Sequence, residues 1–270
     1  NSSEIGAITF KPETESSAYH QRIETIRQIS DEGMLKRIAS SDPDYYARQI
    51  ATEKLSDQSL LFNIAKNDRD YYVRMAAVDK IRDQKLLFQI VMECRDDYYV
   101  CKEALNKIYD PELLENVVSE ADDHDTRIMA VSAISDQDIL KRLLLTIHDF
   151  SIRTEVIKKI KNVDVLRNIA LTDNDYYVRG IAVQMLDDQS LLETIALNDP
   201  DYYVRNEAVL KIENPQVLLE IIKNDDDFEV RKKAISRIND THLLDELLKE
   251  TSDNFISKKI KKRKEEIQLR

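Results

Sequence analysis

Glycine is nearly missing from this chain, with 3 residues in 270, and tryptophan is absent. Folds rich in β-turns need glycine where the backbone becomes left-handed. The small number of glycines therefore argues against a β-rich architecture. They also leave no glycine-rich phosphate-binding loop. The hydrophobic class makes up 42% and the charged residues 34%. That mixture is typical of short amphipathic helices and argues against a disordered chain.

Cysteine and long apolar runs are also scarce. The two cysteines, Cys94 and Cys101, are too few for a disulfide framework. Cys101 stands where related segments carry arginine, which indicates replacement of that arginine and not a reactive thiol. No apolar run reaches the roughly 18 residues that span a bilayer, so no membrane association is expected. We expect a cytoplasmic protein, although a start at Asn1 without methionine is compatible with a removed secretory signal.

Positive charge is in the minority. The formal net charge is −11, and a binder of phosphate backbones needs a cationic surface. Nucleic acid is therefore an unlikely general partner. The one strongly basic stretch runs from Lys258 to Lys264. We interpret it as a solvated end of the chain, with a local anchor for nucleic acid or an acidic partner as the alternative.

What the chain does contain is one stretch repeated many times. Asp201-Tyr202-Tyr203-Val204-Arg205 recurs almost unchanged at residues 70–74 and 175–179. Eight of the nine steps between equivalent positions are 26 residues, and the remaining step, from Val73 to Val100, is 27. The equivalent positions are Gln21, Ala47, Val73, Val100, Thr126, Ile152, Val178, Val204, Val230 and Ile256. A fixed period in this range predicts a stacked repeat array.

Each repeat predicts two short helices. In the first helix, apolar residues recur at the equivalent position and four, five and eight residues beyond it, as in Val73, Ala77, Val78 and Ile81. This spacing forms one helical stripe. The second helix follows a capping residue such as Asp57 and carries paired apolar residues. Neither helix is stable alone at this length, so stacking must bury both stripes.

The ends of the array differ from its middle. Residues 1–14 carry no repeat signal and predict a flexible N-terminal lead-in, and residues 15–270 predict a single solenoid. After Ile256 and Ile260, lysines replace the apolar residues, which predicts a C-terminal capping helix. The sequence therefore predicts an all-α superhelix of about nine 26-residue two-helix repeats plus that helix.

Aspartate recurs three residues before the equivalent position in nine repeats, where it would cap the first helix. Two aromatic positions follow it. On a helical wheel, the first of them, such as Tyr71, flanks the apolar stripe and the second, such as Tyr72, points away. We therefore expect the first ring to pack in the core and the second to be exposed. The exposed candidates are Tyr46, Tyr72, Tyr99, Tyr177 and Tyr203.

The segment Asp199-Pro200-Asp201-Tyr202-Tyr203-Val204-Arg205 resembles the first helix of HEAT-type repeats, and is also similar to leucine-rich variant repeats. The resemblance covers about residues 17–264 and implies a right-handed α-α superhelix whose second helices line the concave face. It also implies an Asp–Arg ladder between neighbouring repeats, formed here by Asp44, Asp70, Asp175 and Asp201 with Arg48, Arg74, Arg179 and Arg205. Cys101 and Ser257 lack the arginine.

Candidate chemistry is sparse. The four histidines share no common position within their repeats, and no His-Glu motif of the HEAT-like di-iron hydroxylases occurs. We therefore expect no catalytic residues, no cofactor and no metal site. The leading hypothesis is a non-catalytic scaffold for a protein or peptide partner. The alternatives are a HEAT-like lyase-type enzyme subunit and a nucleic-acid binder that uses the C-terminal basic helix.

The binding surface is expected over residues 42–120. Three of the exposed tyrosine candidates lie there, and Phe62, Phe88 and Met92 on adjacent second helices could form an exposed apolar patch. The alternative for these three side chains is packing against the next helix, because exposed apolar patches are uncommon on monomers.

Overall fold

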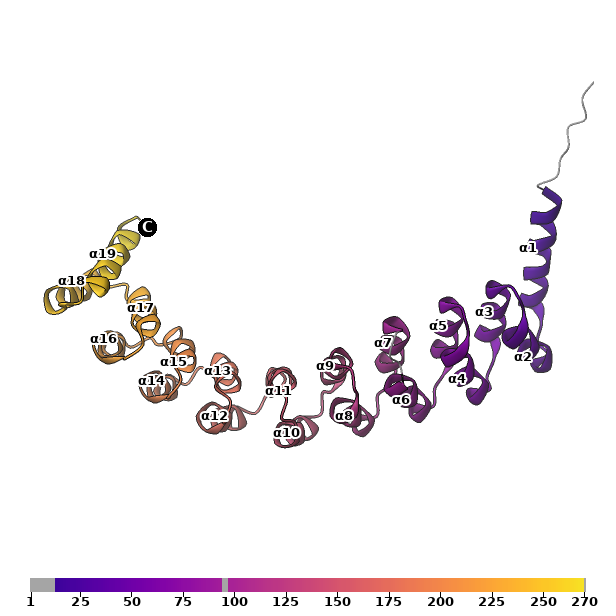
Figure 1. Cartoon of the computed structure of the whole chain (residues 1–270), viewed down its shortest axis with the longest axis horizontal. Coiled ribbons are helices and arrows are strands. Elements are labelled where there is room, and N and C mark those ends of the chain that lie inside the picture. The colour runs from indigo at the N-terminus through magenta and orange to yellow at the C-terminus, as the bar shows by residue number, and fades with distance from the viewer. Residues whose placement is uncertain (1–12, 94–96, 270) are drawn as a thin grey trace, which may run out of the picture. The chain divides into compact units, whose positions relative to one another are not determined.

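The computed structural model describes residues 13–93 and 97–269. These residues form nineteen helices and no strand (Figure 1). Within each unit defined below, every second helix packs on the first helix that follows it, as in a helical repeat solenoid. The chain divides into two compact units, residues 1–134 (unit 1) and 135–270 (unit 2). The predicted all-α repeat architecture is confirmed. The predicted lead-in boundary after residue 14 falls inside the first helix, which begins at Glu13.

Within unit 1, each repeat contributes one first helix and one second helix. The first helices are α1 (Glu13–Gln28), α3 (Tyr45–Lys54), α5 (Tyr71–Lys80), α7 (Tyr98–Asn106) and α9 (His124–Ala133). The second helices are α2 (Glu32–Ser41), α4 (Gln58–Asn67), α6 (Gln84–Glu93) and α8 (Pro111–Glu120).

Unit 2 continues the same alternation. Its first helices are α11 (Phe150–Ile157), α13 (Tyr176–Gln184), α15 (Tyr202–Val209), α17 (Phe228–Arg237) and α19 (Asn254–Gln268). Its second helices are α10 (Gln137–Thr146), α12 (Val163–Thr172), α14 (Gln189–Asn198), α16 (Pro215–Asn224) and α18 (Thr241–Glu250).

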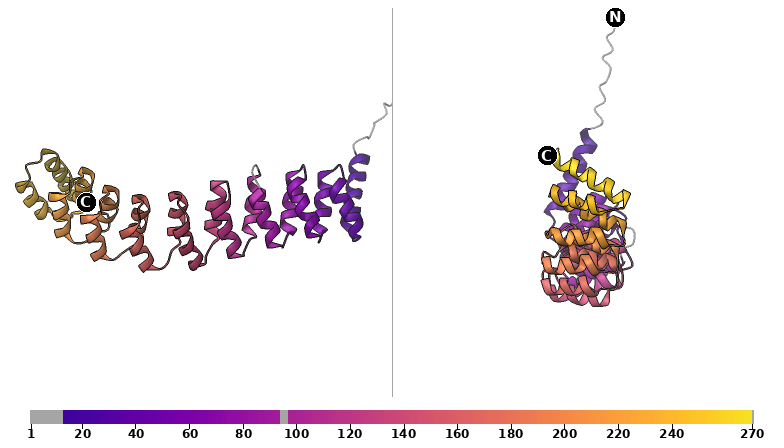
Figure 2. Two further views of the ribbon diagram at one scale, coloured as in Figure 1. Left: turned by 60° about the horizontal axis from the view of Figure 1, so that its bottom comes forward. Right: turned by 90° about the vertical axis from the view of Figure 1, so that its left-hand side faces the viewer.

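The helices form two rows within each unit, one of first helices and one of second helices (Figure 1), and Figure 2 shows them from two further directions. First helices contact one another more extensively than second helices do: α3 contacts α5 more than α4 contacts α6, and α13 contacts α15 more than α14 contacts α16. Each unit taken alone therefore bends toward its first helices. This differs from the expectation that second helices line the inner face, because the small Ala77 and Ala182 let first helices approach closely.

The core follows the predicted stripe. Three residues of α5 and the residue that follows the helix are fully buried: Val73, Ala77, Val78 and Ile81. Leu61 of α4 is equally inaccessible. Because the same spacing recurs in every repeat, each helix buries one stripe against its neighbours. At roughly 25 cal/mol for each Å² of buried apolar surface, this stripe is the main source of stability.

Aspartate capping is confirmed in every first helix from α3 to α19. The side chains of Asp44, Asp70, Asp97 and their counterparts each accept a hydrogen bond from a backbone N–H in the first turn of the following helix. The described backbone has no residue in the left-handed region. Extended residues such as Asp68 (φ −63°, ψ 135°) end the second helices, which explains how the chain turns so often with so little glycine.

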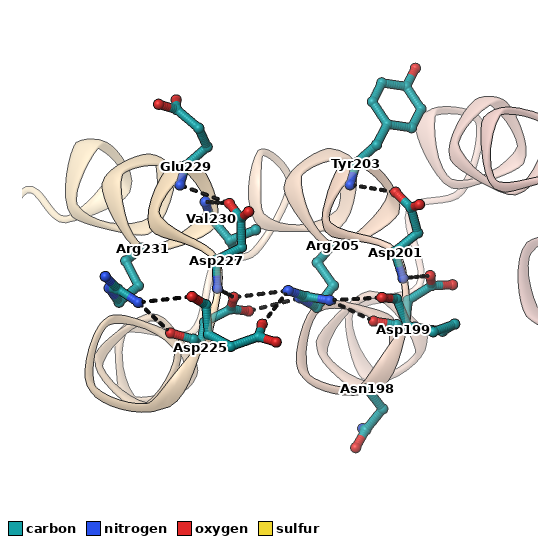
Figure 3. A network of polar contacts seen from close by, with 12 residues as sticks. Asn198, Asp199, Asp201, Tyr203, Arg205, Asp225, Asp227, Glu229, Val230 and Arg231 are labelled. Atoms are coloured by element: carbon teal, nitrogen blue, oxygen red, sulfur yellow. Dashed lines mark hydrogen bonds and ion pairs between the residues drawn. The ribbon is translucent and has the colours of Figure 1, made fainter.

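In most repeats an arginine of the first helix binds an aspartate close to the start of the next first helix. The Arg48 guanidinium binds both carboxylate oxygens of Asp68 at 2.8 and 2.9 Å and donates to the carbonyl of Asp42. Arg179 and Arg205 bind in the same way, and Figure 3 shows the Arg205 contacts. The pairs of this ladder are Arg22–Asp42, Arg48–Asp68, Arg74–Asp97, Arg153–Asp173, Arg179–Asp199 and Arg205–Asp225.

The ladder therefore exists, but the expected acidic partners were wrong. In five of these six pairs the acceptor is the aspartate that directly follows the next second helix along the chain. It lies two residues before the aspartate that caps the next first helix. The capping carboxylate is already committed to backbone N–H groups. Arg74 binds the capping residue Asp97 at the one step of 27 residues. Arg22 and Arg231 also lie within 4.0 Å of the capping residues Asp44 and Asp253.

A second set of polar contacts lies at the opposite ends of the helices. Gln189, the first residue of α14, donates to the carbonyl of Lys211 and accepts from the backbone N–H of Glu213 in the next repeat. Gln58, Gln84 and Gln137 make the same pair of bonds to their neighbours. Both edges of the stack are therefore tied by a side chain that satisfies backbone groups of the adjacent repeat.

We predict that Asp68→Asn lowers the free energy of unfolding of unit 1 by about 3 kcal/mol, because it leaves the buried Arg48 guanidinium without its counter-charge. Urea denaturation at pH 7 measures the loss. Glu250→Gln is the matched control, since its pair with Lys223 is exposed and exposed pairs contribute about 0–1 kcal/mol. Equal losses in the two variants would contradict a structural role for the ladder.

The same pair predicts a pH dependence. Burial alone would raise the pKa of Asp68, but hydrogen bonds from Arg48 and the backbone N–H of Asp70 lower it below its usual value. Because the pKa of Asp68 is lower in the folded than in the unfolded state, its ionised carboxylate stabilises the fold fully above the unfolded value near 3.9. This contribution is lost as the pH falls through the folded pKa. The difference in Tm between the wild type and Asp68→Asn should therefore shrink between pH 7 and pH 3. A constant difference would contradict this.

Candidate partner-binding surface

Six tyrosines of unit 1 form one continuous row at the starts of α3, α5 and α7. Neighbouring ring centroids lie 5.3–6.5 Å apart, in edge-to-face or tilted arrangements. Going along the row, the rings are Tyr46, Tyr45, Tyr72, Tyr71, Tyr99 and Tyr98. We call these six residues the tyrosine row. Separations of this size are those that aromatic pairs prefer.

The row is built by contacts between repeats. The first ring of one repeat packs on the second ring of the next: Tyr45 on Tyr72, and Tyr71 on Tyr99. Unit 2 repeats the arrangement in the pairs Phe150–Tyr177, Tyr176–Tyr203 and Phe228–Phe255. The aromatic doublet is therefore an inter-repeat contact at the edge of the stack.

The expectation that the first ring packs in the core is wrong for most repeats. Tyr45, Tyr98, Tyr176 and Tyr202 are about half exposed, whereas Tyr71 is half-buried. Side chains of a helix tilt toward its N-terminus. A ring in the first turn therefore projects past the end of the helix, beyond the packed stripe, whichever way the helical wheel turns it.

The five expected exposed tyrosines also divide. Tyr72 and Tyr99 are the most exposed, at 59% and 63%, and Tyr177 is 38% exposed. Tyr46 is half-buried because its ring packs against the cluster of Ile23, Ile26 and Ile50. Tyr203 is half-buried because its ring lies against Gly180 of the neighbouring helix α13.

Gly180 of α13 makes room for the ring of Tyr203. A Cβ atom at residue 180 would lie 2.4 Å from that ring. The ring stacks on Tyr177 with centroids 5.5 Å apart and planes inclined by 19°. Gln49 and Met75 stand at the equivalent position in unit 1. The close stacking of Tyr203 on Tyr177 therefore covers ring faces that stay accessible on Tyr72 and Tyr99. Figure 3 shows the Tyr203 side chain directed away from the ladder.

Phe62, Phe88 and Met92, the candidates on the second helices, are half-buried and not freely exposed. The Nζ atom of Lys66 lies 5.1 Å from the centre of the Phe62 ring and covers part of it. The exposed apolar patch that these three side chains were expected to form is therefore smaller than predicted. Their contact with a partner remains a hypothesis.

The basic stretch of α19 is largely engaged within the chain. The buried Arg263 guanidinium donates to the carbonyl of Ile238 and to Asn239, and Lys264 pairs with Asp245. The Nζ atom of Lys259 lies 5.0 Å from the centre of the Phe255 ring. Arg263 and Lys264 therefore hold the last helix in place, which the run of positive charges did not reveal.

No other feature of the described residues forms a chemical site. A cavity of about 370 Å³ between the ends of α2 and α4 is lined by Arg48, Asp68, Asn63 and neighbouring polar groups, and its charged members are the paired ladder residues. In the described parts of the chain, no three His, Cys, Asp or Glu side chains are grouped to hold a metal ion. No helix there is long and apolar enough to cross a bilayer.

Comparison with known proteins adds no functional assignment. No protein-family model matches the chain, and no curated protein shows significant similarity to it.

We predict that Gly180→Ala displaces the Tyr203 ring with little net change in stability, since the gain of about 1 kcal/mol in helix propensity offsets lost ring packing. Burial, with a smaller contribution from Glu207, raises the pKa of Tyr203. The variant should therefore begin to form tyrosinate at lower pH, measured by absorbance near the tyrosinate band. Tyr203→Phe identifies the Tyr203 component. An unchanged titration in Gly180→Ala would contradict the proposed fit.

Proposed function

We propose that this protein is a non-catalytic scaffold that binds a protein or peptide partner along the tyrosine row of unit 1. The observation that carries the proposal is the contiguity of six rings, of which Tyr72 and Tyr99 are more than half exposed. Tyrosine is enriched in the cores of protein interfaces and among the residues that dominate binding energy. A monomer seldom leaves such a contiguous surface uncovered without a use for it.

The framework beneath the row supports the same proposal. Asp44 and Asp70 cap the helices from which the rings project, and the buried Arg48–Asp68 pair joins those two helix starts. Tyrosine has only two side-chain torsions to fix on binding. A partner would therefore meet rings whose positions are already set, which lowers the entropy cost of association.

The alternatives have less support. Binding of nucleic acid through α19 would depend on the lysines that stay exposed there, Lys258, Lys261 and Lys262, beside residues already engaged in structural contacts. A lyase-type subunit would need a catalytic group, and no grouping of titratable side chains on the described surface suggests one. The HEAT-like relationship and a cytoplasmic location remain parts of this proposal, resting on the sequence resemblance and composition.

A displayed peptide library tests the proposal. Peptides selected on the wild type should lose at least tenfold in affinity for Tyr72→Ser/Tyr99→Ser, while the melting temperature changes by only a few degrees, because substitutions at exposed positions usually shift stability by about 0.5 kcal/mol or less. Leu145→Ser, which removes an exposed leucine of unit 2, is the control and should bind normally.

The double variant Phe62→Ser/Phe88→Ser tests the alternative site on the second helices in the same experiment. Because these rings are half-buried, we expect a lower melting temperature and retained binding at a temperature where the variant is folded. Loss of binding in the phenylalanine variant together with full binding in the tyrosine variant would move the site to the second helices and overturn the proposal.

A further inference from the structure

We infer that a cavity between the starts of α16 and α18 binds the carboxamide of a glutamine side chain supplied by a peptide partner. The cavity has a volume of about 370 Å³, lies within unit 2 and is lined by the segments 212–218 and 237–243. It does not involve the tyrosine row. The inference therefore goes beyond the proposed function and does not depend on it.

The fold itself indicates which group this position of the repeat takes. The first residue of four second helices is a glutamine whose carboxamide bridges to the end of the following first helix. In one of them, Gln58 Nε2 donates to the carbonyl of Lys80 at 3.4 Å, and Oε1 accepts from the backbone N–H of Arg82 at 2.8 Å. One planar group that both donates and accepts thus satisfies two peptide groups at once. The four residues are Gln58, Gln84, Gln137 and Gln189.

In α16 this glutamine is replaced by Pro215, whose side chain has no donor or acceptor. The equivalent peptide groups at the end of α17 are the carbonyl of Arg237 and the backbone N–H of Asn239. In the described parts of the chain, neither group has a hydrogen-bond partner. Both residues line the cavity. The cavity therefore presents the pair of groups that the carboxamide binds elsewhere in the fold, without the carboxamide.

The backbone at this place has the conformation that a glutamine already binds in unit 1. Ile238 separates the two free groups and has φ −73° and ψ 129°. Ile81 separates the two groups that Gln58 binds and has φ −72° and ψ 133°. The carbonyl and the N–H on either side of Ile238 are therefore oriented like those on either side of Ile81. A carboxamide that enters the cavity can make the same two hydrogen bonds.

The walls of the cavity favour a neutral amide on an aliphatic stem. The buried side chains of Ile212 and Leu218 line it and can cover methylene groups. Its charged members are the carboxylates of Glu213 and Asp240 and the guanidinium of Arg237, which donates to the carbonyl of Ile212. Two carboxylates against one guanidinium disfavour a glutamate, which also has no hydrogen to donate. A lysine can donate but cannot accept, so glutamine fits best.

Proton–nitrogen correlation NMR of the 270-residue chain tests this site, because the Asn239 amide signal reports directly on the hydrogen bond that we infer. The probe is N-acetyl-glutamine methylamide. The matched controls are the same compound built on methionine, which has a similar length and no amide, and on glutamate. We expect a saturable shift of the Asn239 signal with the glutamine compound. Both controls should bind about tenfold more weakly, since each lacks one or both of the hydrogen bonds.

Pro215→Gln should fill the site from within. It gives α16 the residue that four other second helices carry, and its own carboxamide then binds the free groups of Arg237 and Asn239. We expect the Asn239 signal to move in this variant without any ligand, and the affinity for the probe to fall about tenfold. Pro215→Ala leaves the cavity open, and Val163→Gln adds a glutamine at the same position of α12, outside the cavity. Both should bind the probe as the wild type does.

Three results would overturn the inference: equal binding of the methionine or glutamate compound, no saturable shift at Asn239, or undiminished binding to a folded Pro215→Gln variant. If that variant does not fold, the comparison of the three compounds on the wild type decides alone. None of these results bears on Tyr72 and Tyr99, so the proposed function stands or falls separately.

Discussion

The buried pairing of an arginine with the aspartate just before the next first helix, as in Arg48 and Asp68, is the polar contact that positions successive helix starts. The Arg48 and Asp68 side chains are 4% and 9% exposed, so neither charge is solvated by water. Such a pair is stable only when nearly every donor and acceptor is satisfied. Arg48 meets that condition by binding the Asp68 carboxylate and the Asp42 carbonyl, while Asp68 also accepts from the backbone N–H of Asp70.

This geometry connects the ladder to the proposed function. Asp68 ends α4 and lies two residues before the cap of α5, so the arginine of one repeat fixes the helix start from which the next aromatic doublet projects. The same pair therefore helps to position the rings of successive repeats. A surface built in this way presents a row of aromatic contacts at the period of the repeat, and a partner whose own side chains recur at that period can match it.

Much of the architecture could be predicted from the sequence because it depends on local rules. The 26-residue period, the capping aspartates and the apolar stripe each rest on spacing within one or two helices, and all are confirmed. The scarcity of glycine also has its explanation here, since aspartates in the extended region make the turns after the second helices. The recurring Asp-Gln pair, as in Asp188-Gln189, was a visible signal for the second polar ladder that the sequence reasoning did not use.

The errors came from contacts between repeats and from the third dimension of the helix. Five first helices, α3, α5, α13, α15 and α17, are preceded by aspartate at two positions. Spacing along the chain does not say which of the two binds the arginine of the preceding first helix. The helical wheel placed Tyr45 and Tyr202 in the core because it ignores displacement along the axis. Nothing in the sequence around Tyr203 indicated its burial, because the cause is the missing side chain of Gly180 one repeat earlier.

The central claim is that partners are bound at the starts of the first helices. The most direct measurement is site-specific photo-crosslinking of a selected peptide, with a benzophenone amino acid placed at residue 72 in one variant and at residue 88 in another. We expect a covalent adduct from position 72, at the start of α5, and none from position 88, a half-buried position on α6. An adduct at position 88 with none at position 72 would contradict the account.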